Sequence, residues 1–383
     1  MAEVEQQFGG GAEEADGLQV GGADAVTELE TQAPAAAFDA DPVVAAGFTA
    51  FEAGDLEAAE AVFAPAAENG GRAAMFGLGL VHQARDDFDQ AVRWYAAAAE
   101  LGEAEAANNL GTLLAVRGEN DAAVAWLSQA VALGSSEAAV NLGRMNHWDN
   151  PAEAEFWYRR GAEAEVGSAM ANIGVLAQRR GDLAQAAEWY RKAVEAGEVR
   201  AVNNLGNVLL MQGEVEEAMD CFKRGADGGD GHAQVNFALL SLARGEVQEA
   251  LHAAERGRES DAPGAEVVYG QVLLATGDQQ GAAEAFQRAM NAGDPSGAYA
   301  LGVVAAQTGA LIDAERLFLA AANAGHVPAM WNSAVLLQQS GKTEAALPWF
   351  EAAAAAGHPE AQAVLSGAIT VQPGGDAGGV ATA

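Results

Sequence analysis

The sequence repeats itself with a period of 32 residues, and this regularity restricts the possible folds more than any other feature. A small residue stands at ten positions in one register: Gly47, Gly79, Gly111, Gly143, Gly174, Gly206, Ala238, Gly270, Gly302 and Ala334. Every step is 32 residues except that from Gly143 to Gly174, which is 31. A fixed period of this length is typical of a solenoid in which each repeat is one supersecondary unit.

Two further columns keep the same register. Twelve residues after the small position, or eleven in the short repeat, every repeat carries alanine: Ala59, Ala91, Ala123, Ala154, Ala186, Ala218, Ala250, Ala282, Ala314 and Ala346. Four residues later comes a larger side chain, with Ala254 as the exception: Phe63, Tyr95, Leu127, Tyr158, Tyr190, Phe222, Phe286, Phe318 and Phe350. Residues four apart share a helix face, so small residues let helix backbones approach and large ones fill the space between helix pairs.

Turn signals separate the columns. Glycine followed by an acidic residue occurs between them in six repeats, for example Gly54-Asp55 and Gly181-Asp182. Glycine ends a helix in a left-handed turn, and an acid favours the start of the next helix. Each repeat therefore predicts helix, turn, helix, turn. In the sixth repeat the two helices are expected at 199–212 and 215–227.

Three irregularities carry their own predictions. The short repeat has its deletion near Asn150-Pro151, where proline suits the first position of a helix and a tighter turn is expected. Pro65 and Pro348 fall inside predicted second helices and are expected to kink or shorten them. Residues 358–369 are expected to form one extra first helix that caps the last hydrophobic seam.

The pattern resembles the tetratricopeptide repeat superfamily, and within it the Sel1-like branch. The Leu-Gly pairs and the spacing to alanine and the aromatic match the former. The stretches Trp-Tyr-Arg-Arg-Gly-Ala at 157–162 and Trp-Tyr-Arg-Lys-Ala at 189–193 are similar to the latter. The resemblance covers about 42–369 and implies a right-handed α-solenoid of about ten helix-turn-helix repeats plus a C-terminal capping helix. It also implies that the first helices line a concave surface that binds protein segments. The units are shorter than usual tetratricopeptide units and lack the glycine-rich insertion of Sel1 units.

Charge and composition limit the partners. The chain has 20 Lys and Arg against 54 Asp and Glu, a net charge of −34. This deficit of basic residues disfavours nucleic-acid binding. A GC-rich genome, salt adaptation and repulsion of nucleic acid or anionic membranes all remain explanations of the acidity. No apolar stretch suggests a membrane span, and the amino terminus does not resemble a signal peptide, so a cytoplasmic location is expected.

The two ends differ from the middle. Residues 1–41 contain ten acidic residues and no basic one, which predicts a disordered acidic leader. Its expected role is solvation, with folding back into the groove as the alternative. Residues 370–383 are predicted to form a flexible Gly-rich tail.

Candidates for chemistry are few. The six histidines show no metal-binding spacing, although His326 and His358 share a repeat position at a helix start. Cys221 takes the slot of a tryptophan in other repeats and is expected to be a small buried hydrophobic residue. No catalytic residue, metal or cofactor is predicted, and the chain is not expected to be an enzyme.

An asparagine column marks the candidate binding surface. Two residues before the small position, five consecutive repeats carry asparagine: Asn109, Asn141, Asn172, Asn204 and Asn236. An amide both donates and accepts, so such a ladder can pair with the main chain of an extended peptide. Alternatively, these side chains bond neighbouring helices and fix the stacking of repeats.

Basic residues gather beside this column. Between Asn141 and Arg200 there are eight basic and nine acidic residues, near balance in a strongly acidic chain. Three arginines come from first helices, beside His147 and Trp148: Arg144, Arg179 and Arg200. They predict a site for an acidic or carboxylate-ended segment, unless they are exposed and paired with neighbouring acids. The predicted function is a scaffold for protein–protein interaction. The alternatives are a regulatory array of an enzyme complex and a salt-adapted structural protein without a groove ligand.

Overall fold

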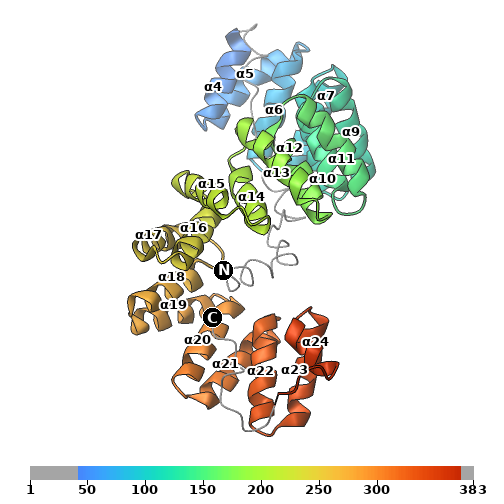
Figure 1. Cartoon of the computed structure of the whole chain (residues 1–383). Helices are drawn as coiled ribbons and strands as arrows, with labels where there is room; N and C mark the ends of the chain where they lie inside the picture. The colour runs from blue at the N-terminus through green and yellow to red at the C-terminus, as the bar shows by residue number, and fades with distance from the viewer. Residues whose placement is uncertain (1–41, 372–383) are drawn as a thin grey trace. The chain divides into compact units, whose positions relative to one another are not determined.

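The computed structural model describes residues 42–371, which contain 21 α-helices and no β-strand (Figure 1). The predicted all-α repeat fold is confirmed. The predicted leader and residues 372–383 of the predicted tail lie outside the described residues. The chain divides into two compact units between Glu214 and Val215, here called unit 1 and unit 2. Within the described range, no helix has the length and apolar character needed to cross a membrane.

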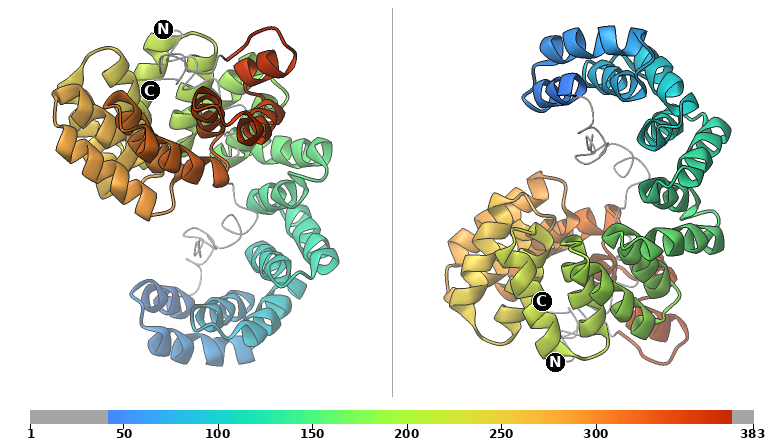
Figure 2. Two further views of the ribbon diagram at one scale, coloured as in Figure 1. Left: turned by 90° about the horizontal axis from the view of Figure 1, so that it is seen from below. Right: turned by 90° about the horizontal axis from the view of Figure 1, so that it is seen from above.

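Unit 1 consists of helices α4 to α14, and each packs against the next along the chain. Its first helices are α4 (Pro42–Glu52), α6 (Arg72–Ala84), α8 (Ala104–Val116), α10 (Ser136–Asn146), α12 (Gly167–Arg179) and α14 (Arg200–Met211). Its second helices are α5 (Leu56–Glu68), α7 (Phe88–Glu100), α9 (Asn120–Ala132), α11 (Pro151–Glu163) and α13 (Leu183–Glu195). Figure 2 shows the blue-to-green helices of this unit following one another in a curved row. Helix α14 is one residue shorter at each end than predicted.

Unit 2 repeats the arrangement with helices α15 to α24. Its second helices are α15 (Val215–Asp227), α17 (Val247–Glu259), α19 (Gln279–Asn291), α21 (Leu311–Asn323) and α23 (Thr343–Ala355). Its first helices are α16 (Gly231–Ala243), α18 (Ala265–Thr276), α20 (Pro295–Gln307), α22 (Val327–Gln339) and α24 (Pro359–Leu365). The predicted capping helix is present as α24, but the predicted range 358–369 was too long. Ser366 caps it, and Gly367 follows at φ +76°, a left-handed conformation that ends a helix.

The small and large columns are complementary surfaces in the core. A Cβ atom added to Gly174 would lie 2.7 Å from Cε1 of Tyr190, so an alanine at residue 174 would require the ring to shift. Tyr190 is completely buried. In the repeat that carries Ala254 instead of a large residue, the small position is Ala238 and both methyl groups are buried. In this repeat, loss of the ring and gain of a Cβ occur together, whereas the last repeat combines Ala334 with the ring of Phe350, and both are buried.

The turns form as predicted. Gly181 adopts φ +77°, and the next residue, Asp182, caps α13 by accepting a hydrogen bond from the Gln185 amide at 3.0 Å. This cap satisfies one of the amide groups left unpaired at a helix start. The short repeat also begins its second helix as predicted, with Pro151 in the first turn of α11 and Asn150 as the cap.

The two internal prolines do not shorten their helices. Helices α5 and α23 contain 13 residues each, as do most of the other helices, so the prediction of shortening at Pro65 and Pro348 was wrong. Phe63 and Ala67, on either side of Pro65 in α5, are buried in the core. Burial of these neighbours stabilises the helix although proline removes one backbone hydrogen bond.

Candidate binding surface

The asparagine column is divided between the two units. Asn109, Asn141, Asn172 and Asn204 lie on α8, α10, α12 and α14 of unit 1, at equivalent positions of successive first helices. Asn236 lies on α16 of unit 2 and is therefore treated separately. The candidate surface consequently belongs to the first helices of unit 1.

Two members of the column contact neighbouring helices. The Asn141 side chain on α10 donates from Nδ2 to Oδ1 of Asn108 on α8 at 2.9 Å, and Nδ2 of Asn108 lies 3.3 Å from Oδ1 of Asn109. Burial raises the pKa of Tyr95, and a hydrogen bond with Asn109 opposes part of that rise. These contacts connect adjacent repeats, as the stacking alternative requires.

Exposure differs along the column. Asn109 and Asn141 are half-buried, whereas Asn172 and Asn204 expose only 9% and 8% of their surface. A segment bound over these helices would therefore reach the amides of the first pair more readily than those of the second. Half-buried Asn141 still has a carbonyl oxygen that can accept a hydrogen bond.

The predicted arginines include one built into a side-chain cluster. The guanidinium carbon of Arg179, at the end of α12, lies 4.4 Å from the ring centroid of Trp148. Its Nη1 donates to the backbone oxygen of His147 at 3.3 Å. Trp148 is 46% exposed, so one part of the indole supports the arginine while another faces solvent. We call Trp148, Arg179 and Arg144, which lies in the last turn of α10 four residues before Trp148, the platform.

His147 is buried and contacts Trp148 of the platform. Its side chain is only 3% exposed, its Nδ1 lies 3.1 Å from the Tyr158 hydroxyl, and its ring meets that of Trp148 edge-on at 5.0 Å. Burial, followed by the nearby charge of Arg179, lowers the pKa of His147 to about 4. The imidazole is therefore neutral near pH 7, and it fixes the turn that presents Trp148.

The short repeat creates this turn. Helix α10 has 11 residues where the neighbouring first helices α8 and α12 have 13, and it ends at Asn146 with His147 as its cap. Neither residue 147 nor 148 has a positive φ angle, and no glycine stands before Pro151 in this turn. The deletion thus replaces the usual glycine turn with a turn that carries an exposed tryptophan.

The charges of the platform are not neutralised locally. Arg180, next to Arg179, pairs with Glu155 at 2.6 Å, as most described arginines pair with a carboxylate. Within residues 42–371, neither Arg144 nor Arg179 has a carboxylate oxygen within 4.0 Å. The structure thus separates them from the paired surface arginines that were the alternative interpretation.

Arg200 does not join the platform. It is the first residue of α14, whereas Arg179 is the last residue of α12. Because successive first helices run in the same direction, the two residues stand at opposite ends of the row, about 18 Å apart along the helix axes. Any role of Arg200 would be at a different point of a bound segment.

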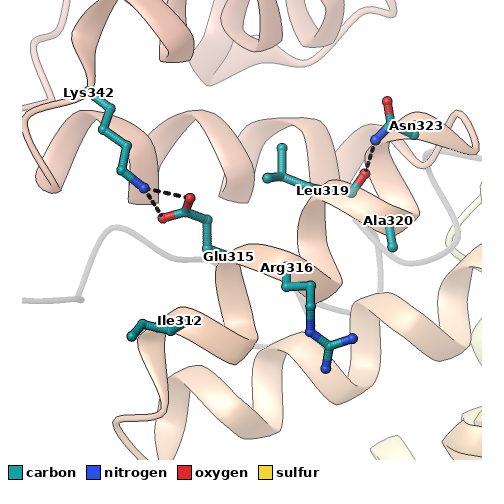
Figure 3. Close-up of a pocket in the computed structure, with 7 residues that line it drawn as sticks. All are labelled: Ile312, Glu315, Arg316, Leu319, Ala320, Asn323 and Lys342. Atoms are coloured by element: carbon teal, nitrogen blue, oxygen red, sulfur yellow. Dashed lines mark hydrogen bonds and ion pairs between the residues drawn. The ribbon is translucent and has the colours of Figure 1, made fainter.

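Other regions of the described chain offer weaker candidate sites. A shallow hollow on unit 2 is lined mainly by α21, and Figure 3 shows Lys342 reaching across to Glu315. Lys342 Nζ lies 2.7 and 2.8 Å from the two carboxylate oxygens of Glu315, so the carboxylate that lines the hollow is already paired. Cys221 is buried, as predicted. Among the described side chains, no group of three His, Cys, Asp or Glu residues is placed to hold a metal ion.

Comparisons with known proteins agree with the fold. Four stretches match the tetratricopeptide repeat family, residues 44–104, 83–138, 172–233 and 235–298, and together they cover more than half of the chain. No curated protein matches the sequence. A protective antigen of uropathogenic Escherichia coli strains, which has an SLR fold, is 23% identical over 85% of this chain and 78% of its own, with a TM-score of 0.60.

A Sel1 repeat protein from Oxalobacter formigenes is 22% identical over 57% of this chain and 99% of its own, with a TM-score of 0.47. At these identities the likeness concerns the fold alone. Proteins built from such repeats are typically non-enzymatic and generally mediate protein–protein interactions. The chain therefore belongs to the tetratricopeptide repeat family and has the fold of its Sel1-like branch.

Proposed function

We propose that the protein is a cytoplasmic interaction scaffold whose unit 1 binds an extended acidic or carboxylate-ended segment of a partner protein on its first helices. The observation that carries this proposal is Arg179, which stacks on the exposed Trp148 and, like Arg144, has no carboxylate partner among residues 42–371. Acidic residues outnumber basic ones by 54 to 20 in this chain, so most arginines find a carboxylate nearby. An arginine without a carboxylate partner among the described residues is available to a carboxylate from a partner protein.

The chemistry of the platform suits such a segment. A guanidinium binds a carboxylate through two parallel hydrogen bonds, and stacking on an aromatic ring holds its plane in place. Since Arg179 is already oriented by Trp148 and the His147 carbonyl, binding costs little side-chain entropy. An apolar side chain next to the carboxylate would cover the exposed part of the indole. The half-buried amides of Asn109 and Asn141 would supply hydrogen bonds to the main chain.

The test uses the full chain and two fluorescein-labelled dodecapeptides, one of alternating Glu and Leu and one of alternating Gln and Leu. Fluorescence anisotropy should show that the Glu peptide binds and the Gln peptide does not. Arg179→Gln and Arg144→Gln should each weaken binding about tenfold, since one charge-assisted pair contributes about 1.5 kcal/mol. Arg160→Gln is the matched control, because Arg160 is exposed on α11 and its loss changes the net charge equally.

Equal loss in all three variants would show non-specific attraction, and equal binding of both peptides would remove the carboxylate from the proposal. A separate experiment replaces the two half-buried members of the column, Asn109 and Asn141, with Ala. Weaker peptide binding with an unchanged melting temperature supports a binding role for the column. A collapse of the melting temperature would instead assign these asparagines to the stacking of repeats.

A further inference from the structure

Two histidine–aromatic ring contacts, one tilted and one flat and here called stacks, connect the last three first helices of unit 2. The His326 ring lies 4.6 Å from the Tyr299 ring of α20, with 32° between their planes. One repeat later, the His358 ring lies 5.0 Å from the Trp331 ring of α22, with 17° between their planes. Tyr299 and Trp331 share one repeat position, and the two histidines share another. The stacks are therefore successive copies of one contact, and they link α20, α22 and α24.

His326 also caps helix α22. Its Nδ1 accepts a hydrogen bond from the Ala329 amide at 3.2 Å. One repeat earlier the same position holds Asp294, whose carboxylate accepts from the Ser296 amide at 2.8 Å. A carboxylate keeps its acceptors at neutral and mildly acidic pH, whereas an imidazole nitrogen accepts only when it carries no proton. Histidine at this position thus makes the cap sensitive to protons.

Packing keeps His326 neutral. Burial lowers the pKa of His326 to about 4, and the negative charge of Asp294 opposes this only in part. Tyr299, whose ring packs against that of His326, is a second titratable group at this contact. Burial raises the pKa of Tyr299, and a hydrogen bond with Asn332 opposes part of that rise. A proton on His326 would therefore place a charge in a largely apolar contact.

His358 lies in a comparable setting. Its Nδ1 is buried and lies 3.2 Å from Oε2 of Glu360, without the geometry of a hydrogen bond. Burial lowers the pKa of His358 and outweighs the opposing effect of Glu360. The flat stack on Trp331 covers one face of its ring.

We propose that the two stacks form an acid-sensitive latch at the C-terminal end of unit 2. A proton on His326 ends its role as acceptor and places a cation at the positive end of the α22 dipole. A proton on His358 charges the contact between α22 and α24. The protonated rings leave their stacks, so α24 and the start of α22 loosen and the faces of Tyr299 and Trp331 become accessible.

The direction and size of the effect follow from linkage. An open state in which His326 titrates at its ordinary 6.5 binds protons at a pH where the closed state, with a pKa of about 4, does not. Opening is therefore unchanged above pH 6.5 and grows as the pH falls toward 4. Between about pH 7.5 and pH 5 it should increase roughly 30-fold for His326 alone.

The experiment is hydrogen–deuterium exchange with mass spectrometry on the full chain, with each protection factor referred to the intrinsic exchange rate at the same pH. We expect α24 and the first turns of α22 to lose at least about tenfold in protection between about pH 7.5 and pH 5, while α16 does not. His326→Asn keeps an acceptor at the cap but cannot titrate. In this variant, the protection of α22 should therefore fall by less than about threefold over the same pH change. His252→Asn, at an exposed histidine of α17, should behave as the unmodified chain.

A uniform loss of protection over all helices of unit 2 would show general acid unfolding and overturn the latch. The latch would also be overturned if α22 of His326→Asn lost as much protection at low pH as α22 of the unmodified chain. His326→Asp, which restores the cap used at Asp294, provides a second non-titrating variant if the asparagine variant does not fold. If the protection factors of α22 and α24 in the wild-type chain are the same at about pH 5 as at about pH 7.5, the proposal is refuted without any variant.

Discussion

The fit between the small and large columns predicts a glycine-to-alanine substitution that destabilises the protein when the facing ring is present and stabilises it when the ring is removed. Gly302 lies in α20 against Phe318 of α21, and a Cβ at residue 302 would lie 2.7 Å from Cδ1 of that ring. Phe318 is completely buried and cannot move aside easily. Gly302→Ala should therefore cost about 1–3 kcal/mol through overpacking, of which better helix propensity returns about 0.5–1 kcal/mol.

Removing the ring changes this balance. Phe318→Ala alone should cost about 3–5 kcal/mol, because it leaves a cavity in the core. In that background Gly302→Ala meets no ring and adds a methyl group to the cavity, so it should stabilise by about 0.5–1 kcal/mol. The double variant reproduces the pair Ala238 and Ala254, which this chain already tolerates. The two sites should thus be coupled by about 2 kcal/mol.

The assay is urea unfolding, followed by far-ultraviolet circular dichroism, of the unmodified chain, the two single variants and the double variant. The midpoint of each unfolding transition and the slope of its free energy against urea concentration are compared. Equal slopes are needed for the comparison, because a changed slope signals a changed unfolding unit. If Gly302→Ala destabilises Phe318→Ala as much as it destabilises the unmodified chain, the ring is not what requires the glycine. The explanation of the repeat's small column would then be wrong.

Two further predictions concern polar contacts. Tyr158→Phe removes the hydroxyl group 3.1 Å from Nδ1 of His147 and should lower the free energy of unfolding in urea by about 1–2 kcal/mol, since it leaves a buried nitrogen without a partner. Burial alone raises the pKa of Glu266, but hydrogen bonds from Arg288 and Arg258 more than offset this and hold it below its usual 4.5. Its stabilisation is present above 4.5 and lost as the pH falls through the depressed pKa, so the melting temperature should drop on Glu266→Gln near pH 7 but not at a pH below that depressed pKa.

The fold was predictable because its determinants recur in every repeat. The small-residue and alanine columns appear in all ten repeats and the large column in nine of them, so errors at single positions do not change the conclusion. Ends of helices are less well determined, since they depend on single residues such as Gly367, which stops α24 early. Pro65 was misleading because local propensity predicts a shortened helix, whereas burial of Phe63 and Ala67 in the same helix outweighs it.

The candidate surface was predictable in residue type but not in arrangement. The sequence places Arg144 and Arg179 on first helices, yet the stack of Arg179 on Trp148 depends on a turn geometry set by the deletion. Likewise, the shared position of His326 and His358 is visible in the sequence. The matching pair of aromatics, Tyr299 and Trp331, would have been found by reading a fourth column three residues before the small position.

Both proposals involve places where the repeat departs from its own pattern. Each repeat contacts mainly its neighbours, so a change confined to one turn or one cap alters a local surface without disturbing distant repeats. The deletion before Pro151 presents Trp148 to solvent, and histidine in place of the aspartate cap makes the start of α22 responsive to protons. Regular positions are constrained by packing, as Gly302 is by Phe318, and cannot acquire new chemistry at low cost. In a solenoid of this kind, a binding or regulatory role is therefore to be sought at the residues that break the period.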